Sequence, residues 1–145
     1  MEKLYAQCLL WVVGFTGGQS YADALHAAFR DKPASPILFS LEDCLTDAGH
    51  SLSLLETACT GQGSAAELEV FAKELFSGLQ AVYHENRFSL PVFGSKCHCL
   101  WEALPEGWRY QQPFHTLEYA QDSLGWGDED GMRAHLEAAF VKACG

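Results

Sequence analysis

Residues 64–85 read SAAELEVFAKELFSGLQAVYHE and carry the clearest helical pattern in the chain. Ser64 and Glu67 have the spacing of a capping box, in which the serine side chain and the glutamate side chain each bind a free backbone amide at the helix start. Apolar residues then recur at steps of three and four: Leu68, Phe71, Leu75, Leu79 and Val82. This spacing places them on one face. The stretch therefore predicts an amphipathic helix that packs against other helices.

Weaker helical patterns lie on both sides of this stretch. Residues 2–15 are almost continuously apolar, so their periodicity fits a buried helix and a buried strand equally well. Further helices are expected where apolar residues recur at helical spacing: residues 20–29, 40–58, 113–124 and 132–143. Acidic residues at 128–130 precede the last of these and favour a helix N-terminus, where the helix dipole is positive.

Residues 88–112 lack a sustained helical pattern. Prolines, glycines, cysteines and tryptophans interrupt the helical period, and Pro91 and Pro105 each favour extended backbone at the preceding residue. We expect irregular chain here, with short strands and one short helix at residues 99–104. The predicted fold is mainly α: a single compact domain, residues 1–145, of about five or six helices with an irregular aromatic-rich segment around residues 88–112.

The charge of the chain restricts its partners. Its 145 residues include 19 Asp and Glu against 9 Lys and Arg, for a net charge of -10 and a pI near 4.9. Arg30 and Lys32 are the closest basic pair, so no basic stripe exists to bind a phosphate backbone. Direct nucleic-acid binding and membrane docking are disfavoured. The acidity instead suits a protein partner with a basic surface.

The cysteines and the N-terminal residues indicate a compartment. Six cysteines have irregular spacing in a chain large enough to form a core without disulfides, so we expect free thiols in a reducing cytoplasm. Glu2 and Gln7 are atypical of a secretory signal peptide, and we expect this segment to be retained. The sequence predicts a cytoplasmic protein without a cofactor.

One cluster could bind a metal or react as a thiol. Lys96, Cys97, His98 and Cys99 are consecutive, and Cys97 and Cys99 could ligate zinc together with His84 and His115. Zinc prefers four nitrogen or sulfur donors, although the two cysteines are closer in sequence than in common zinc knuckles. Neighbouring basic groups could also lower a thiol pKa. The alternative hypothesis is therefore a metal- or thiol-dependent enzyme, or a zinc-binding domain.

The aromatic residues between positions 88 and 126 are the favoured candidates for function. They could close the core, or they could form a recognition surface, because tryptophan and tyrosine dominate interface hot spots. For the second case the predicted partner-binding residues combine aromatic anchors with an acidic rim: Trp101, Glu102, Glu106, Trp108, Tyr110, Glu118, Asp122 and Trp126.

These observations favour one functional hypothesis. We expect a small, acidic, non-catalytic protein of bacterial or phage origin that binds a protein and masks its basic surface. Toxin immunity proteins and anti-CRISPR inhibitors share this physical profile, which is an analogy of class and not of sequence motif. An acidic rim would steer association, while the aromatic side chains would anchor the contact.

Overall fold

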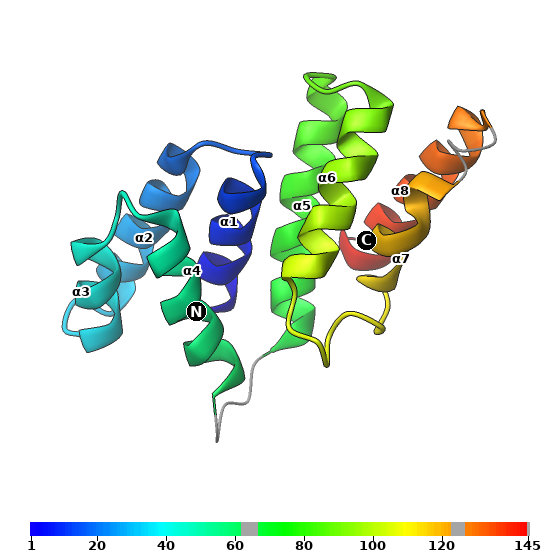
Figure 1. The fold of residues 1–145 in the computed structure, drawn as a ribbon. Helices are drawn as coiled ribbons and strands as arrows, with labels where there is room; N and C mark the ends of the chain where they lie inside the picture. Colours follow the sequence, from blue (N-terminus) through cyan, green and yellow to red (C-terminus); the bar gives the residue numbers. More distant parts are fainter. Residues whose placement is uncertain (62–66, 123–126, 145) are drawn as a thin grey trace. The chain divides into compact units, whose positions relative to one another are not determined.

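A computed structural model describes residues 1–61, 67–122 and 127–144, which form eight helices and no strand. The mainly α prediction is confirmed. The expected five or six helices were too few, and the short strands expected around residues 88–112 are not found in the described chain. Contacts group the residues into two compact units, Met1–Glu74 and Leu75–Gly145. The expectation of a single domain stays a prediction. Figure 1 shows the helices in chain order.

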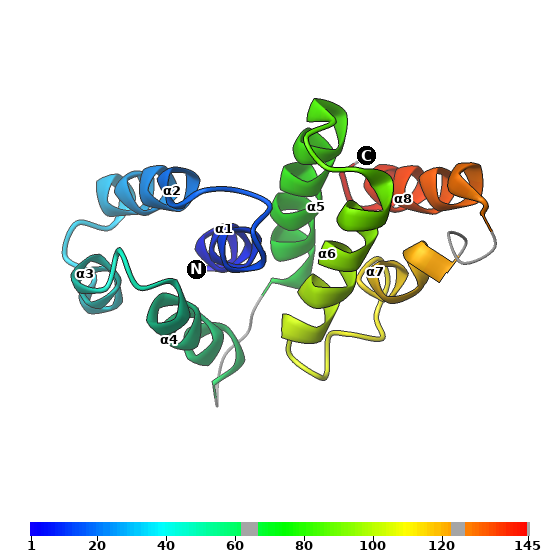
Figure 2. The same cartoon turned by 45° about the horizontal axis from the view of Figure 1, so that its top comes forward.

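Unit 1 is organised around α1. It contains α1 (Glu2–Val13), α2 (Gly18–Asp31), α3 (Pro36–Asp43), α4 (Ala48–Thr60) and the first turns of α5 (Leu68–Glu85). Helix α1 packs against α2 and α4, and α2 packs against α3, as Figure 2 shows. This arrangement explains why residues 2–15 are so apolar: a helix with neighbours on two sides buries most of its surface.

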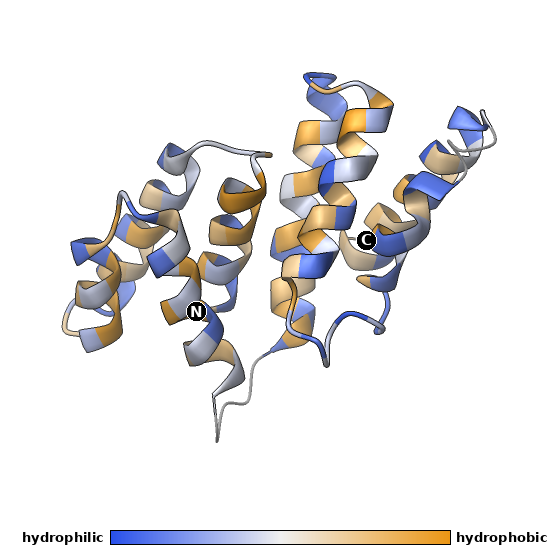
Figure 3. Cartoon of the chain, viewed as in Figure 1, coloured by the Kyte–Doolittle hydropathy of each residue, from blue (hydrophilic) through white to orange (hydrophobic). Residues whose placement is uncertain are grey.

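The core of unit 1 draws on all its helices. Tyr5 of α1 lies against Phe71 of α5, with ring centroids 5.2 Å apart. Leu9 of α1, Leu25 of α2 and Leu55 of α4 are fully buried. Figure 3 shows the apolar residues over several turns of α1. None of the helices in the described residues combines the length and the apolarity that a membrane span requires.

The helix expected over residues 40–58 is two helices. The break falls before α4, where the Asp47 side chain accepts a hydrogen bond from the backbone N–H of His50 at 3.0 Å. Aspartate is a favoured N-cap because its carboxylate binds an amide that has no partner within the helix. The sequence interpretation began the helix that precedes this pair at residue 20, whereas the N-cap of α2 is Gly17.

Unit 2 contains the rest of α5, followed by α6 (Leu90–Ala103), α7 (His115–Tyr119) and α8 (Glu129–Cys144). The predicted stripe of α5 is buried at Phe71, Leu75, Leu79 and Val82 and half-buried at Leu68. Helix α8 also follows its predicted pattern. Helix α7 is shorter than the predicted helix over residues 113–124, part of which lies outside the described residues. Ser64, the first residue of the predicted capping box, lies outside them too.

The largest error of the sequence interpretation concerns α6. Residues 90–103 are helical, although an irregular segment was expected around 88–112. Ser89 is the N-cap, and its hydroxyl accepts a hydrogen bond from the Val92 N–H at 3.4 Å. Pro91 stands in the first turn, where a helix needs no backbone donor and the fixed φ of proline is already helical. The same proline that argued against a helix therefore marks its beginning.

Candidate interaction site

Six aromatic rings in unit 2 form a continuous series in which each ring contacts the next. We call this series the ring chain. Successive ring centroids are 5.8, 5.6, 5.5, 5.4 and 5.5 Å apart. The rings belong to α6, to the segment after it, to α7 and to α8: His98, Trp101, Tyr110, His115, Tyr119 and His135. These distances suit offset or edge-to-face aromatic contacts, so the rings support one another.

The helical spacing of the sequence builds most of this arrangement. His98 and Trp101 are three residues apart on α6, and His115 and Tyr119 are four apart on α7, so each pair shares a helix face. Helices α6 and α7 pack against each other, which brings the two pairs together. Tyr110, between the helices, contacts Trp101 on one side and His115 on the other.

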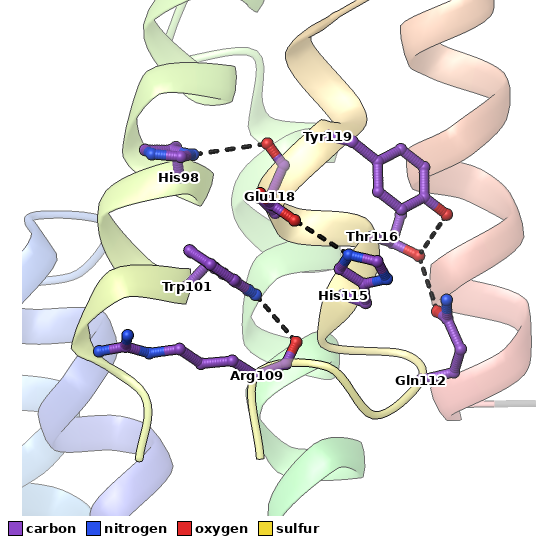
Figure 4. Close-up of polar contacts among 8 residues, drawn as sticks. All are labelled: His98, Trp101, Arg109, Gln112, His115, Thr116, Glu118 and Tyr119. Carbon is purple, nitrogen blue, oxygen red and sulfur yellow. Dashed lines mark hydrogen bonds and ion pairs between the residues drawn. The ribbon is translucent and has the colours of Figure 1, made fainter. Parts of the chain in front are cut away.

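Trp101 is the buried member of the ring chain. Its side chain is 8% exposed, and its indole Nε1 donates a hydrogen bond to the Arg109 carbonyl oxygen at 2.9 Å. The Arg109 guanidinium lies over the indole ring, with its Cζ 5.4 Å from the centroid, and donates to the carbonyl oxygens of Leu104 and Glu102. Figure 4 shows the tryptophan and the arginine side by side. The structure thus places this predicted anchor beneath the surface.

Two histidines join carboxylates beside the buried indole. His98 Nε2 lies 3.0 Å from Glu102 Oε1, and its Nδ1 lies 3.4 Å from the backbone oxygen of Glu118. His115 Nε2 lies 2.9 Å from Glu118 Oε2, as Figure 4 shows. Because both ring nitrogens of His98 face oxygen acceptors, only its protonated form can donate to both. Through its contact with the Glu118 backbone oxygen, His98 connects α6 to α7.

The other predicted partner-binding residues differ in exposure. Tyr110 is 65% exposed, and Glu102, Glu106 and Asp122 are exposed as well. Trp108 and Glu118 are half-buried. Trp126 lies outside the described residues. The surface that remains accessible is therefore one tyrosine, two histidine-linked carboxylates and acidic side chains on the adjoining segments.

The alternative metal ligands do not converge. Cys97 is completely buried on the inner face of α6, whereas Cys99 is exposed, because residues two apart on a helix point about 200° apart. His115 is bound to Glu118, and His84 contacts Tyr83 at the end of α5. Across residues 1–61, 67–122 and 127–144, no group of three or more His, Cys, Asp or Glu side chains is placed to hold an ion.

The thiols should differ sharply in reactivity. Burial raises the pKa of Cys97 well above its usual range, raises that of Cys8 to about 12 and raises that of Cys59 to about 11. Because the thiolate is the reactive form, we expect these three to resist a thiol reagent in the native protein at mildly alkaline pH. Cys99 is exposed and should react within the mixing time.

Mass spectrometry of the labelled peptides checks this expectation, with the unfolded protein as the control in which every cysteine reacts. Rapid native labelling of Cys97 would contradict the burial described for α6.

Comparisons with protein-family models, with curated proteins and with solved structures find no match to this chain. The site therefore has to be interpreted from its own geometry.

Sequence reasoning missed several residues that organise the site. Arg109, Tyr119 and His135 were not among the predicted residues, and His98 was considered only beside the cysteines. Glutamate follows His98 by four residues and His115 by three, which is the spacing of side-chain pairs on a helix. For His98 and Glu102 that signal could be used only once α6 was recognised as a helix, whereas His115 and Glu118 lie within the helix expected over residues 113–124.

Proposed function

We propose that this chain is a non-catalytic protein-binding module that masks a basic surface of its partner. The contact would be made by an acidic ring face, which we define as Tyr110, His115, Glu102, Glu118 and their exposed acidic neighbours. The observation that carries the proposal is the ring chain itself, which leaves Tyr110 65% exposed between two histidine–carboxylate pairs.

The chemistry of this face suits a basic protein. An exposed tyrosine offers a large apolar ring with a polar tip, and such side chains are enriched at interface hot spots. Carboxylates around it would pair with Lys or Arg of the partner and exclude partners of like charge. The net charge of -10 adds a long-range field of the same sign, which raises the rate of encounter with a basic surface.

The buried part of the site supports the exposed part. The hydrogen bond from Trp101 to Arg109 and the three contacts of Arg109 fix the segment that carries Tyr110. A tyrosine held in one position loses less side-chain freedom on binding than a mobile one, and this preorganisation increases affinity. Trp101 accordingly acts by positioning Tyr110 and not by contacting the partner.

The class of partner follows from the same charges. Enzymes that act on nucleic acids carry basic substrate channels, and an acidic aromatic face can occupy such a channel. We propose an inhibitor of this kind, of bacterial or phage origin, comparable in role to immunity proteins or anti-CRISPR proteins. What supports it is the acidity of the chain and the character of the face, together with the absence of a basic stripe from the sequence.

The test compares proteins captured from a lysate of the source organism by the natural chain and by two variants. Tyr110→Ala and the double variant Glu102→Gln/Glu118→Gln should each reduce retention of the partner by at least about tenfold, the effect of losing one hot-spot contact. The recovered partner, measured with the purified chain, should bind more weakly as ionic strength rises, because salt screens exposed charges.

A matched control distinguishes the contribution of the acidic ring face to partner binding from that of the net charge. Glu42→Gln/Asp43→Asn removes two exposed carboxylates of α3 in unit 1, and retention should stay near that of the natural chain. Equal loss with this control, or binding that is insensitive to salt, would contradict the proposal.

A further inference from the structure

Unit 1 holds a cavity of about 580 Å³ that is partly open to solvent. It lies among α1, α2, α3 and the first turns of α5, on residues that all belong to unit 1. Its volume falls inside the range of about 300–1,000 Å³ that is typical of small-molecule sites in proteins. Nothing in the proposed function of unit 2 makes use of it.

The sequence of α2 explains why this space is not filled. Ala24, Ala27 and Ala28 stand three and four residues apart, so they share the helix face that lines the cavity. Each offers a single methyl group, while Leu4, Ile37 and Val70 close the sides from the neighbouring helices. The walls are therefore mainly aliphatic and suit a flexible or flat apolar group.

The charged residues at the cavity differ in whether they have partners. Glu2 accepts from the backbone N–H of Glu67 at 3.3 Å, and Glu74 accepts from the Gln7 amide at 2.9 Å. Lys3, Lys32 and Asp31 also line the cavity. Within the described residues, neither lysine forms an ion pair.

Two lysines supply positive charge at this cavity. The chain has 19 acidic residues for 9 basic ones, and two of the nine, the exposed Lys3 and Lys32, line the same cavity. Lysine lays its aliphatic stem along apolar surface and keeps its ammonium group at the water boundary. Lys3 and Lys32 therefore fit the role of receiving an anionic group at the mouth of an apolar space.

We propose that this cavity binds an amphipathic carboxylate, with the apolar body against the alanine face of α2 and the carboxylate at Lys3 and Lys32. Both ammonium groups would donate charge-assisted hydrogen bonds, which are about twice as strong as neutral ones. Asp31 lies next to Lys32 in sequence and weakens the site for a second negative charge, which favours ligands with one carboxylate. The site is independent of the acidic ring face.

The test is a titration of the full-length chain with laurate, measured by calorimetry below the concentration at which laurate forms micelles. We expect saturable binding with one molecule per chain. Replacing either lysine, as Lys3→Gln or Lys32→Gln, should weaken it about tenfold through loss of one charge-assisted hydrogen bond. Dodecanol, which has the same chain without the charge, should bind more weakly than laurate.

A cavity-filling variant tests the apolar part. Ala27→Phe should abolish measurable laurate binding, whereas Ala138→Phe, an exposed position on α8, should leave the affinity unchanged. Circular dichroism of each variant shows whether it is folded, and the two lysine variants test the site even if Ala27→Phe does not fold. Absence of saturable binding, equal loss in the Ala138→Phe control, or stronger binding of dodecylamine than of laurate would each overturn the proposal. Any of these outcomes would leave the proposed function of unit 2 untouched.

Discussion

Replacing Trp101 with alanine is expected to lower the free energy of unfolding by about 3–5 kcal/mol, the usual cost of removing a buried tryptophan. The indole is 8% exposed, contacts His98 and Tyr110 through its ring, and lies under the Arg109 guanidinium. Its removal leaves a cavity and frees the Arg109 carbonyl oxygen from its 2.9 Å hydrogen bond. Denaturant unfolding followed by circular dichroism measures the loss.

Trp101→Phe is the matched variant. It keeps an aromatic ring at the same place and loses the Nε1–H donor, so it should cost less, about 1 kcal/mol for the missing hydrogen bond plus a smaller packing term. A Trp101→Ala protein that keeps its stability but no longer binds its partner would contradict the structure. It would support the sequence interpretation, in which this tryptophan contacts the partner directly.

Replacing Gly94 with alanine is expected to destabilise the protein by about 1–3 kcal/mol, which is the cost of overpacking a filled site. A Cβ at this position on α6 would lie 2.7 Å from Met132 Cε and 2.9 Å from Gln121 Cβ. The methionine methyl group can move aside, but the Gln121 Cβ is attached to the backbone, so the chain has to shift. This steric cost opposes the gain of about 1 kcal/mol that alanine brings in a helix.

The same substitution at Gly49 gives the control with the opposite sign. Gly49 lies in α4, and its added Cβ would be 3.7 Å from Asp47 Oδ1, an ordinary contact distance. Gly49→Ala should therefore stabilise the protein by up to about 1 kcal/mol. Thermal unfolding of both variants beside the natural chain gives the comparison. If Gly94→Ala were also stabilising, the close approach of α6 to Gln121, just after α7, would be wrong.

The sequence predicted helices where one local signal was enough. The apolar stripe of α5 and the acidic start of α8 each specify a helix without help from the rest of the chain. The signal at α6 was ambiguous, because Pro91 is compatible both with extended chain before it and with a helix that starts beside it. Recognition of Ser89 as an N-cap resolves that ambiguity, and the same kind of cap at Asp47 separates α3 from α4.

The sequence analysis named candidate site residues without their layout. It expected tryptophan, tyrosine and acidic side chains between positions 101 and 126 to form one recognition surface, and this assignment stays a prediction. Which of them are exposed depends on how α6 meets α7, and no local pattern fixes that packing. The Arg109 guanidinium covers the Trp101 ring, and the Arg109 carbonyl oxygen accepts from its indole N–H. An irregular turn separates the two residues in the sequence.

Three consecutive residues of α6 have three different environments. Cys97 lies in the interior, His98 belongs to the ring chain and Cys99 is exposed to solvent. A photoactivatable cross-linker tethered to the Cys99 sulfur would thus stand one position along the backbone from His98 while leaving the packed interior intact. Covalent trapping from that point would identify a bound protein, and the peptides it captures would map where that protein lies.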